Sequence, residues 1–499
     1  SGESLIRQAV LGKRWLQEKL GIDEVKTCWI ADCWGHHPQI PQILKKCGYR
    51  YYAFSRSMPE EIATKSEFYW QGLDGTGILT HWMPIGYDGF CFLTEEETKE
   101  WIFLQGKPEK VNLARLQSAI EKLRDFQVTP SLLLPCGADF RKPEKSIIEG
   151  IGEWNRKHPG VKIRFSRSSD FFRRIEEKRE KIPIHKADLN PTFQGTYSSR
   201  IEIKQSNRQM EEMILSGEKL DALCRLLGGH DRSQRLERIW KDILFNQFHD
   251  IIAGSIIDDA YREAMEKYRR TEKRLQKVIA ETIEEFSGKV NISPAGLCLL
   301  VFNPSGFERR DVVEAEVTLL KEGIKGFKVI DGANKEIPSQ IVSGDNKRFR
   351  LLFVDTLPPL GYKVYRLQPQ KKGADYQTGL KVHAGRMENR FLKIKFHPQT
   401  GALTSIFLKE KKQEIVDPQR PFYNDLVYQL DGGDFWVCYE RPVDGTRRTT
   451  TVYSDPMPEG NKAPSSRQGI HSKDSLLNQV SIPEKGPVRV TLQVRGKLV

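Results

Sequence analysis

The sequence contains no apolar run long enough to cross a bilayer. Its longest apolar stretches, SLLLP and LCLLVF, fall far short of the roughly 20 residues that a membrane-spanning helix needs. No signal peptide, transit peptide, lipidation signal or internal repeat is recognisable. With 499 residues, 38% of them hydrophobic, the chain is long enough for about two to four globular domains. We therefore expect a globular protein without a membrane partner.

Paired cysteines are absent as well. The eight cysteines are scattered, and none forms a Cys-x-x-Cys pair. This spacing disfavours a thiolate zinc site or a dithiol redox motif. So low a density in a long chain is typical of reduced structural cysteines. A cytoplasmic location is therefore the default expectation.

Charge of one sign is not segregated along the chain. The 79 basic residues exceed the 66 acidic ones and give a net charge of +13, but the two kinds alternate in stretches such as RRIEEKREK. Interleaved charges are typical of solvated helix faces, whereas a nucleic-acid-binding surface needs a basic stripe. We therefore expect no nucleic-acid partner.

Three sequence patterns follow one another. Residues 1–188 alternate helix and strand patterns, with a hairpin turning at Asp74–Gly75 and a strand over VTPSLLLPCGADF, which predicts a partial α/β domain with a mainly parallel sheet. Residues 189–290 carry three amphipathic runs and predict a three-helix bundle. Residues 291–499 show short alternating strands between turn residues, which predicts a β-sandwich region, truncated at its end. The predicted fold class is therefore multidomain: α/β, three-helix bundle and β-sandwich.

Polar side chains follow the ends of four predicted strands. Because the carboxyl ends of parallel strands meet at one edge of a sheet, we expect these side chains to share one rim. They are Asp32, Arg56, Tyr87, Asp88 and Asp139, with Trp34 close to the first. Carboxylates and arginine bind sugar hydroxyls, aromatic rings stack on pyranoses, and glycosidic cleavage needs two carboxyls in different roles. The set suits a sugar, although each residue alone also fits an ordinary loop or helix-cap position.

His249 and Asp250 lie in FNQFHDIIAGS, between two amphipathic helices. The plain interpretation is a helix-end histidine that faces the C-terminal dipole or is hydrogen-bonded in the core. The alternative is a contribution to a functional site. The adjacent His36 and His37 are interpreted as supporting or solvent-facing residues in preference to metal ligands, and His81 is expected to pack.

Six ordered motifs run from Ser1 to about Val313. They are GESLIRQAVLGKRWLQEKLG, WIADCWGHHPQIPQILKKCG, FYWQGLDGTGILTHWMP, GTYSSRIEIKQSNRQMEEMIL, FNQFHDIIAGS and VFNPSGFERRDVV. In this order they resemble segments of the zinc-dependent α-mannosidases of glycoside hydrolase family 38, and the β region resembles that family more loosely. The resemblance implies an α/β catalytic domain, a three-helix bundle and β-sandwich domains. It also implies hydrolysis of terminal α-mannosidic linkages in a mannose-containing oligosaccharide or glycoside.

The resemblance implies roles for individual residues. Asp32 matches the family's catalytic nucleophile, which is also a zinc ligand, and His249 matches a second zinc ligand. Asp139, in CGADF, matches the general acid/base. The sugar-contact positions matched by motif and order are Trp34, Arg56, Tyr87, Asp88 and Asp250. The implied mechanism is retaining hydrolysis, with the two carboxyl groups about 5 to 5.5 Å apart and Zn²⁺ holding sugar hydroxyls.

One part of the family pattern is missing. The family takes two further zinc ligands from a His-x-Asp pair on an early strand, and none of the ten histidines here is followed two residues later by Asp. That part of the pattern lies upstream of where Ser1 aligns. We therefore expect a fragment truncated at both ends, with an unpaired sheet edge where the first strand is missing. Two protein ligands are fewer than the three usual for catalytic zinc, so we expect weak metal binding and an activity that depends on the missing ligands.

Two other functions fit the sequence less well. A non-catalytic carbohydrate-binding protein would keep the cleft without a complete zinc site, but binding without turnover needs no nucleophile and acid together. A zinc-dependent polysaccharide deacetylase would need a His-rich ligand set of its own, which the sequence lacks. Related bacterial enzymes suggest a homo-oligomer.

Overall fold

The computed structural model describes most of the chain. The described residues are 1–92, 111–137, 139, 145–190, 193–290, 296–319, 323–344, 347–373, 376, 378–417, 424, 426–428, 470–471 and 479–496. The chain forms two compact units. Unit 1 comprises Ser1–Glu211, Trp240–Thr271 and Gly432–Ala463, and unit 2 comprises Glu212–Ile239, Glu272–Asp431 and Pro464–Val499. Within the described ranges, no helix combines the length and the apolarity needed to span a bilayer.

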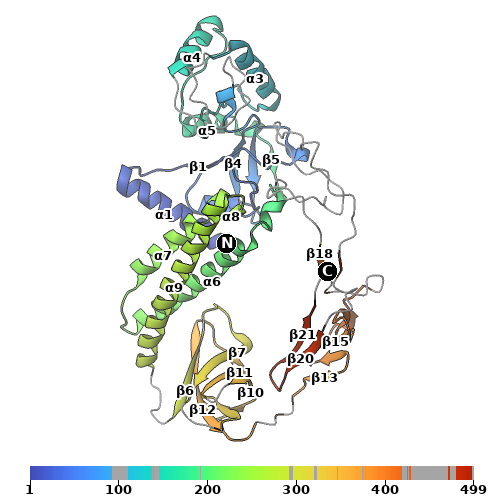
Figure 1. The fold of residues 1–499 in the computed structure, drawn as a ribbon. Helices are drawn as coiled ribbons and strands as arrows, with labels where there is room; N and C mark the ends of the chain where they lie inside the picture. The colour runs from blue at the N-terminus through green and yellow to red at the C-terminus, as the bar shows by residue number, and fades with distance from the viewer. Residues whose placement is uncertain are drawn as a thin grey trace. The chain divides into compact units, whose positions relative to one another are not determined.

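Unit 1 is built on a mixed five-stranded sheet (Figure 1). Its strands are β1 (Thr27–Ile30), β2 (Tyr51–Phe54), β3 (Glu67–Gln71), β4 (Gly77–Trp82) and β5 (Ile184–His185), in the order β1-β2-β4-β3-β5. Three of the pairings are parallel, and β3 with β4 is antiparallel. β3 and β4 form the predicted hairpin, in which Asp74 Oδ1 accepts a hydrogen bond from Thr76 N and Gly75 adopts a φ of 82°. The sheet is mainly parallel, as the alternating pattern predicted.

Both faces of strand β2, which lies between β1 and β4, are buried. Because successive side chains of a strand point to opposite faces, Tyr52 and Phe54 join a cluster with Trp70, whereas Tyr51 joins a second cluster with Phe172. The short apolar run YYAF is therefore covered on both sides, as strands of parallel sheets usually are.

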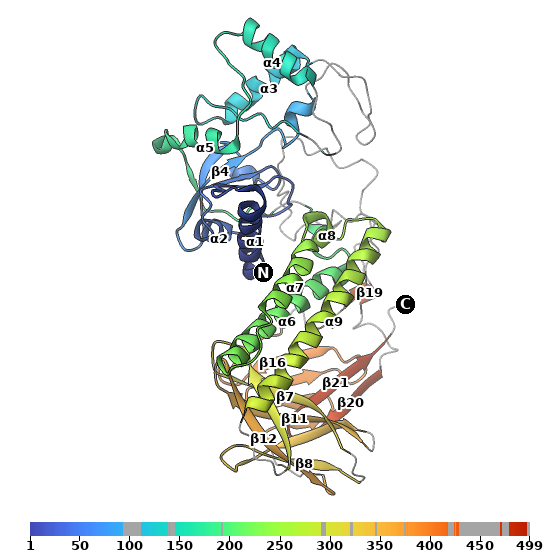
Figure 2. The same cartoon turned by 90° about the vertical axis from the view of Figure 1, so that its left-hand side faces the viewer.

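Helices lie next to the sheet of unit 1 and, further from it, in a separate group (Figure 2). They are α1 (Gly2–Leu20), α2 (Ile40–Lys46), α3 (Leu113–Phe126), α4 (Lys145–Lys157) and α5 (Ser168–Glu176), with short 3₁₀ turns at Glu60–Ile62, Gly89–Phe92, Arg179–Lys181 and Gln194–Tyr197. Helix α5 contributes Phe171 and Phe172 to the second cluster of the sheet. Helices α3 and α4 share a separate core with Leu116 and Trp154.

The segment 128–137 corrects one prediction. It was expected to form a strand, but no strand forms there. Pro130 and Pro135 lack the N–H that a sheet ladder requires. The segment is held near its ends instead, because Val128 N donates to Glu67 Oε2 (3.3 Å) and Phe90 N donates to Pro135 O (3.1 Å). Asp139 therefore follows an irregular segment and not a strand end.

Four helices follow in the chain. They are α6 (Ile201–Leu226), α7 (Ser233–Phe245), α8 (His249–Ala253) and α9 (Asp258–Lys289). The three predicted amphipathic runs correspond to the three long helices. In unit 1, Gln247 Nε2 donates to Asn207 Oδ1 (2.9 Å) and so ties the end of α7 to α6. In unit 2, Leu220 of α6 and Phe286 of α9 share a small core. The division between the units therefore runs through these helices.

Unit 2 contains two antiparallel sheets around one core. Their strands are β6 (Leu297–Asn303), β7 (Arg309–Thr318), β8 (Gly326–Ile330), β9 (Glu336–Ile337), β10 (Ser339–Gly344), β11 (Arg348–Leu357) and β12 (Gly361–Gln370), in the orders β10-β11-β7 and β6-β12-β8-β9. Phe353 from one sheet and Tyr365 from the other meet in the shared core with ring centroids 4.7 Å apart.

Further antiparallel pairs complete the described part of unit 2. A five-stranded sheet contains β13 (Lys381–His383), β14 (Arg386–Glu388), β15 (Leu392–Phe396), β16 (Leu403–Leu408) and β17 (Gln413–Glu414). Two-stranded pairs follow: β18 (Val427–Tyr428) with β19 (Ile470–His471), and β20 (Gln479–Lys485) with β21 (Val490–Arg495). A mixed sheet with helices, followed by antiparallel sheets, agrees with the predicted fold class. The predicted domain boundaries near residues 188 and 290 stay predictions.

Candidate active site

The ends of β1 and β2 place Asp32 beside Arg56. Ser55 N donates to Ala31 O (3.1 Å), so the chain leaving β2 runs next to the chain leaving β1. The Arg56 guanidinium donates from Nε to Asp32 Oδ1, and both side chains are less than a third exposed. Burial alone would raise the pKa of Asp32, but the hydrogen bond with His249 and the charge of Arg56 outweigh it and lower this pKa. Asp32 is therefore a carboxylate that stays ionised at neutral pH.

Tyr87 bridges two carboxyl groups. It follows β4 after a turn at Gly86, whose φ of 82° favours glycine. Its hydroxyl oxygen lies 2.8 Å from Asp139 Oδ2 and 3.4 Å from Asp32 Oδ2. Burial, and then the charge of Asp32, raise the pKa of Tyr87, so the phenol keeps its proton. A single O–H donates fully to one acceptor at a time, and the shorter distance favours Asp139.

Asp88 adds a third carboxyl group to this rim. Burial is the main cause that raises the pKa of Asp88, and the charges of Asp139 and Asp32 act in the same direction. Arg56 opposes this shift because its positive charge favours the ionised form. Acidic groups so close together do not ionise independently of one another.

Helix α8 delivers His249 and Asp250 to the same place. The helix is short, and it is capped by Gly254, which adopts the left-handed conformation with a φ of 79°. His249 Nε2 lies 3.4 Å from Asp32 Oδ2 and 3.7 Å from Asp250 Oδ1. The hydrogen bond with Asp32 raises the pKa of His249 although burial opposes it, whereas burial is the main cause that raises the pKa of Asp250. The imidazole thus faces a carboxylate cluster and is not simply packed in a core.

Trp34 lies beside the imidazole and is only 8% exposed. Its ring meets His249 edge to face, with centroids 6.0 Å apart, and meets Phe193 in the same way at 5.7 Å. The indole therefore supports the His249 ring, and only a small part of it is open to a ligand. The structure brings together the eight residues that the sequence singled out.

His36 and His37, the other two histidines near the site, lie in different environments. His37 is exposed and its Nδ1 accepts a hydrogen bond from Gln39 N (3.1 Å). His36 is buried, with one ring nitrogen next to the Tyr52 hydroxyl and the other next to Arg56 O. The supporting and solvent-facing positions expected for this pair are therefore both found.

Glu67 is the residue of this region that the sequence reasoning missed. Its carboxylate is buried in the sheet, 2.8 Å from His81 Nδ1, and His81 packs as expected. A single acidic residue in a strand pattern gives no sign of burial. The register of the predicted hairpin, however, sets Glu67 directly opposite His81, so that register could have found the pair.

Asp32 and His249 fit two corners of a zinc site. Tetrahedral zinc with bonds of about 2.0–2.1 Å places its donor atoms roughly 3.3 Å apart. Asp32 Oδ2 and His249 Nε2 are separated by 3.4 Å, which matches this spacing. Among the residues that the structure describes, no group of three or more His, Cys, Asp or Glu is placed to hold a metal ion. The described residues therefore fit part of such a site and do not complete it.

Two family models match the chain in succession. The Glycosyl hydrolases family 38 N-terminal domain matches residues 1–195, and the Alpha mannosidase middle domain matches residues 191–286. These two segments contain all the candidate site residues. The match continues in whole-chain comparisons with individual proteins.

Relatives and solved structures point the same way. Alpha-mannosidase G of Dictyostelium discoideum is 23% identical over 534 residues, which cover 99% of this chain and 44% of that protein. A putative mannosylglycerate hydrolase of Halalkalibacterium halodurans is 24% identical over 347 residues, covering 64% of this chain and 37% of that protein. The fold resembles that of an alpha-mannosidase from Enterococcus faecalis V583, with a TM-score of 0.77 and 18% identity over 99% of this chain and 56% of that one. The match thus covers 44%, 37% and 56% of the length of these three proteins, respectively.

Proposed function

Since this chain belongs to glycosyl hydrolase family 38, we propose that it carries the active site of an enzyme that hydrolyses terminal α-mannosidic linkages with retention of configuration. The observation that carries the proposal is the bridge from Asp32 through Tyr87 to Asp139. The two distances at the Tyr87 hydroxyl limit the separation of the carboxyl oxygens Asp32 Oδ2 and Asp139 Oδ2 to about 6 Å. Retaining glycosidases hold their carboxyl groups about 5–5.5 Å apart and inverting enzymes about 6.5–9.5 Å, so this limit favours retention.

The proposed steps use these two carboxyl groups. Asp32 attacks the anomeric carbon of the terminal mannose, the glycosidic C–O bond breaks, and Asp139 gives its proton to the leaving oxygen. Asp139 then takes a proton from water, the water oxygen bonds to the anomeric carbon, and Asp32 leaves as a carboxylate. The lowered pKa of Asp32 supports its part, because a nucleophile must be ionised. Tyr87 keeps the two carboxyl groups in one hydrogen-bonded set.

We propose that Trp34, Arg56, Tyr87, Asp88 and Asp250 contact the mannose. Ionised carboxylates and a guanidinium hold sugar hydroxyls through charge-assisted hydrogen bonds. The substrate class is a mannose-containing oligosaccharide or glycoside. The similarity to a mannosylglycerate hydrolase also makes small mannosides worth assaying.

We also propose that zinc binds at this site and that the described residues supply part of its ligands. Asp32 and His249 would supply two ligands, and further ligands would come from outside the described residues. When bound, zinc would hold sugar hydroxyls near the scissile bond. Metal analysis of the full-length protein checks this, because the zinc content should fall in His249→Ala and stay unchanged in His37→Ala.

The experiment that tests the function follows the stereochemistry of an aryl α-mannoside with the full-length protein. We expect α-mannose as the first product in the proton NMR spectrum, and a kcat reduced about a thousandfold or more in Asp32→Asn. Asp125→Asn, an exposed carboxylate of unit 1, serves as the control and should keep the wild-type rate. β-Mannose as the first product, or an Asp32→Asn variant with the wild-type rate, would refute the assignment.

A carbohydrate-binding protein without turnover is the second candidate. The incomplete set of metal donors among the described residues favours it. Titration with an aryl α-mannoside separates the two functions: binding that is never followed by release of the aryl group, with or without added zinc, supports the second candidate.

We also propose a reducing, cytoplasmic location and a homo-oligomeric state. The first is supported by six cysteines in the described part of the chain that form no disulfide, namely Cys28, Cys33, Cys47, Cys136, Cys224 and Cys298. Cell fractionation checks the location, and light scattering of the purified full-length protein checks the oligomeric state.

A further inference from the structure

The side chain of His36 connects the loop of Asp32 to the peptide that follows Arg56. The ring is 1% exposed, with Nε2 3.2 Å from Arg56 O and Nδ1 2.7 Å from the Tyr52 hydroxyl. A carbonyl oxygen only accepts hydrogen bonds, so Nε2 must carry the proton. In the neutral ring Nδ1 is then an acceptor, and the Tyr52 hydroxyl donates to it. Tyr52 therefore stabilises the tautomer that Arg56 O requires.

The charge state of the ring agrees with this assignment. Complete burial lowers the pKa of His36 to about 4, so the ring is neutral at neutral pH. The backbone of the same residue is fixed too, because His36 N donates to Leu189 O (2.6 Å) and Leu189 N donates to His36 O (3.3 Å). The ring is therefore a rigid anchor on the loop that carries Asp32.

The peptide that receives this hydrogen bond is an unusual one. It joins Arg56 to Ser57, and Ser57 adopts a φ of 73°, a left-handed conformation that a residue with a side chain rarely takes. Ser57 is buried, and within the described structure its hydroxyl has no hydrogen-bond partner that would hold the turn. The hydrogen bond from His36 fixes the plane of this peptide, and with it the ψ of Arg56 and the φ of Ser57.

We propose that His36 is a positioning residue, whose Nε2–H orients the Arg56 peptide so that the guanidinium meets Asp32. The arrangement closes a ring of contacts: the loop carries Asp32 and His36, His36 holds the Arg56 backbone, and the Arg56 side chain returns to Asp32. The catalytic consequence rests on the proposed function, whereas the tautomer does not.

Two substitutions of similar size separate the role of His36 Nε2–H as a donor from the role of Nδ1 as an acceptor. His36→Gln places an amide N–H near the former Nε2 and loses the acceptor for Tyr52. His36→Asn places an amide oxygen near the former Nδ1 and loses the donor to Arg56 O. Each variant leaves one buried group without its partner, so both should lose comparable thermal stability. A merely structural role predicts that activity follows the melting temperature in both.

The experiment compares both variants in the full-length protein with an aryl α-mannoside. We expect kcat/KM to fall about tenfold to a hundredfold in His36→Asn, because small displacements of a catalytic group have effects of this size. His36→Gln should recover most of that loss. Equal kcat/KM values in the two variants, or values that track their melting temperatures, would overturn the proposal.

A second readout does not depend on activity. Nitrogen-15 NMR of histidine-labelled protein distinguishes the two neutral tautomers, and the His36 signals are assigned by their absence from His36→Gln. We expect the Nε2–H form in the wild type and also in Tyr52→Phe, because Arg56 O still accepts from Nε2 when the donor at Nδ1 is lost. An Nδ1–H ring in the wild type contradicts the proposal. If the wild type hydrolyses no mannoside, the proposed function fails. The tautomer of His36 is then the measurement that tests its role as a positioning residue.

Discussion

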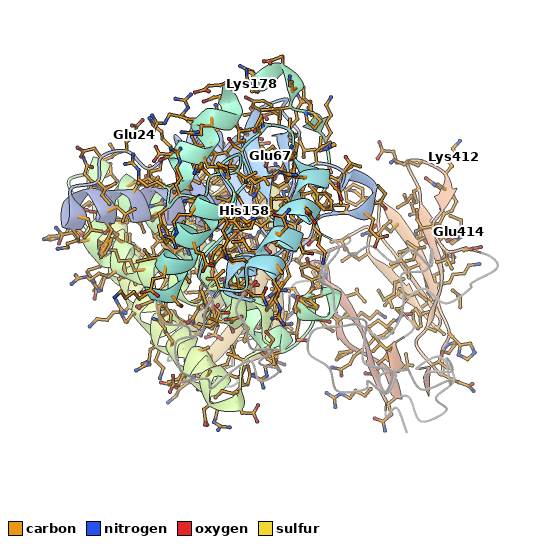
Figure 3. All side chains as sticks on the ribbon, turned by 90° about the horizontal axis from the view of Figure 1, so that it is seen from above. Glu24, Glu67, His158, Lys178, Lys412 and Glu414 are labelled. Carbon is orange, nitrogen blue, oxygen red and sulfur yellow. The ribbon has the colours of Figure 1, made fainter. Side chains whose placement is uncertain are left out.

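The buried carboxylate of Glu67 should control the stability of unit 1. Its side chain is 1% exposed and is labelled in the interior of Figure 3. It accepts three hydrogen bonds, from Ser66 Oγ (2.9 Å), His81 Nδ1 (2.8 Å) and Val128 N (3.3 Å). One carboxylate thus joins both strands of the hairpin to the start of the segment that leads to Asp139.

The expected loss follows from these three donors. In Glu67→Gln one oxygen becomes an NH₂ group, which must face either Val128 N–H or the donors of Ser66 and His81. In the first case Val128 N–H loses its acceptor, and in the second His81 must move its proton to Nε2, which has no acceptor within the described structure, so we expect a loss of about 2 kcal/mol in either case. Glu67→Ala leaves His81 Nδ1–H and Val128 N–H without their acceptor, whereas Ser66 Oγ keeps Phe126 O (3.2 Å), and His81 Nε2 already has no partner within the described structure, so we expect a loss of about 4 kcal/mol.

Thermal unfolding with tryptophan fluorescence measures both losses. Trp70 and Trp82 are fully buried in the same sheet and report its unfolding. A loss of 1 kcal/mol lowers the melting temperature of a domain of this size by about 2–4 °C, so we expect about 4–8 °C for Glu67→Gln and twice that for Glu67→Ala.

The matched control is Glu24→Gln, also labelled in Figure 3. The Glu24 side chain is 70% exposed, and it pairs with Lys26 at the surface (2.7 Å). Exposed pairs contribute about 0–1 kcal/mol, so this variant should melt within a few degrees of the wild type. If Glu67→Gln melted together with Glu24→Gln, the three hydrogen bonds would not stabilise the fold as argued.

Two further predictions concern other parts of the chain. Gly254→Ala should destabilise unit 1 by about 1–3 kcal/mol and reduce mannoside hydrolysis, because the added Cβ would lie 2.6 Å from Ser199 O at a φ of 79°. Urea unfolding measures the stability, and kcat measures the hydrolysis. An unchanged urea midpoint of unfolding would contradict the prediction. In unit 2, the hydrogen bond from Arg232 lowers the pKa of Glu285 from 4.5 to about 2. The depressed pKa means that the stability from this carboxylate is present above pH 4.5 and is lost as the pH falls towards 2. The free energy of unfolding should therefore fall less steeply between pH 6 and pH 2 in Glu285→Gln than in the wild type. Parallel curves of this free energy against pH would refute the prediction.

Much of the site was predictable because its residues follow recognisable local patterns. Asp32 and Arg56 come directly after short apolar runs, and parallel strands bring their ends together without any long-range information. The Asp74–Gly75 turn fixed the hairpin in the same way. The order of the motifs then connected His249 to Asp32, which no spacing rule could have done.

The features that the sequence analysis predicted wrongly or missed depend on contacts with residues far away in the chain. The apolar run SLLLP was indistinguishable from a strand, and its two flanking prolines were the only sign that no ladder would form. Glu67 reads as a surface residue until His81 and Val128 are placed beside it. The conformation of Ser57 is likewise set by His36, which lies on a different loop.

The distance in sequence between Asp32 and His249 has a consequence for biosynthesis. Helix α8 leaves the ribosome more than 200 residues after the loop of Asp32. At about 5–20 residues per second, the nascent chain carries its acidic rim for about 10–40 s before the imidazole that pairs with it exists. During that interval Arg56 is, within the described part of unit 1, the side chain that pairs with Asp32, so a chain that terminates before α8 lacks the pair between His249 and Asp32.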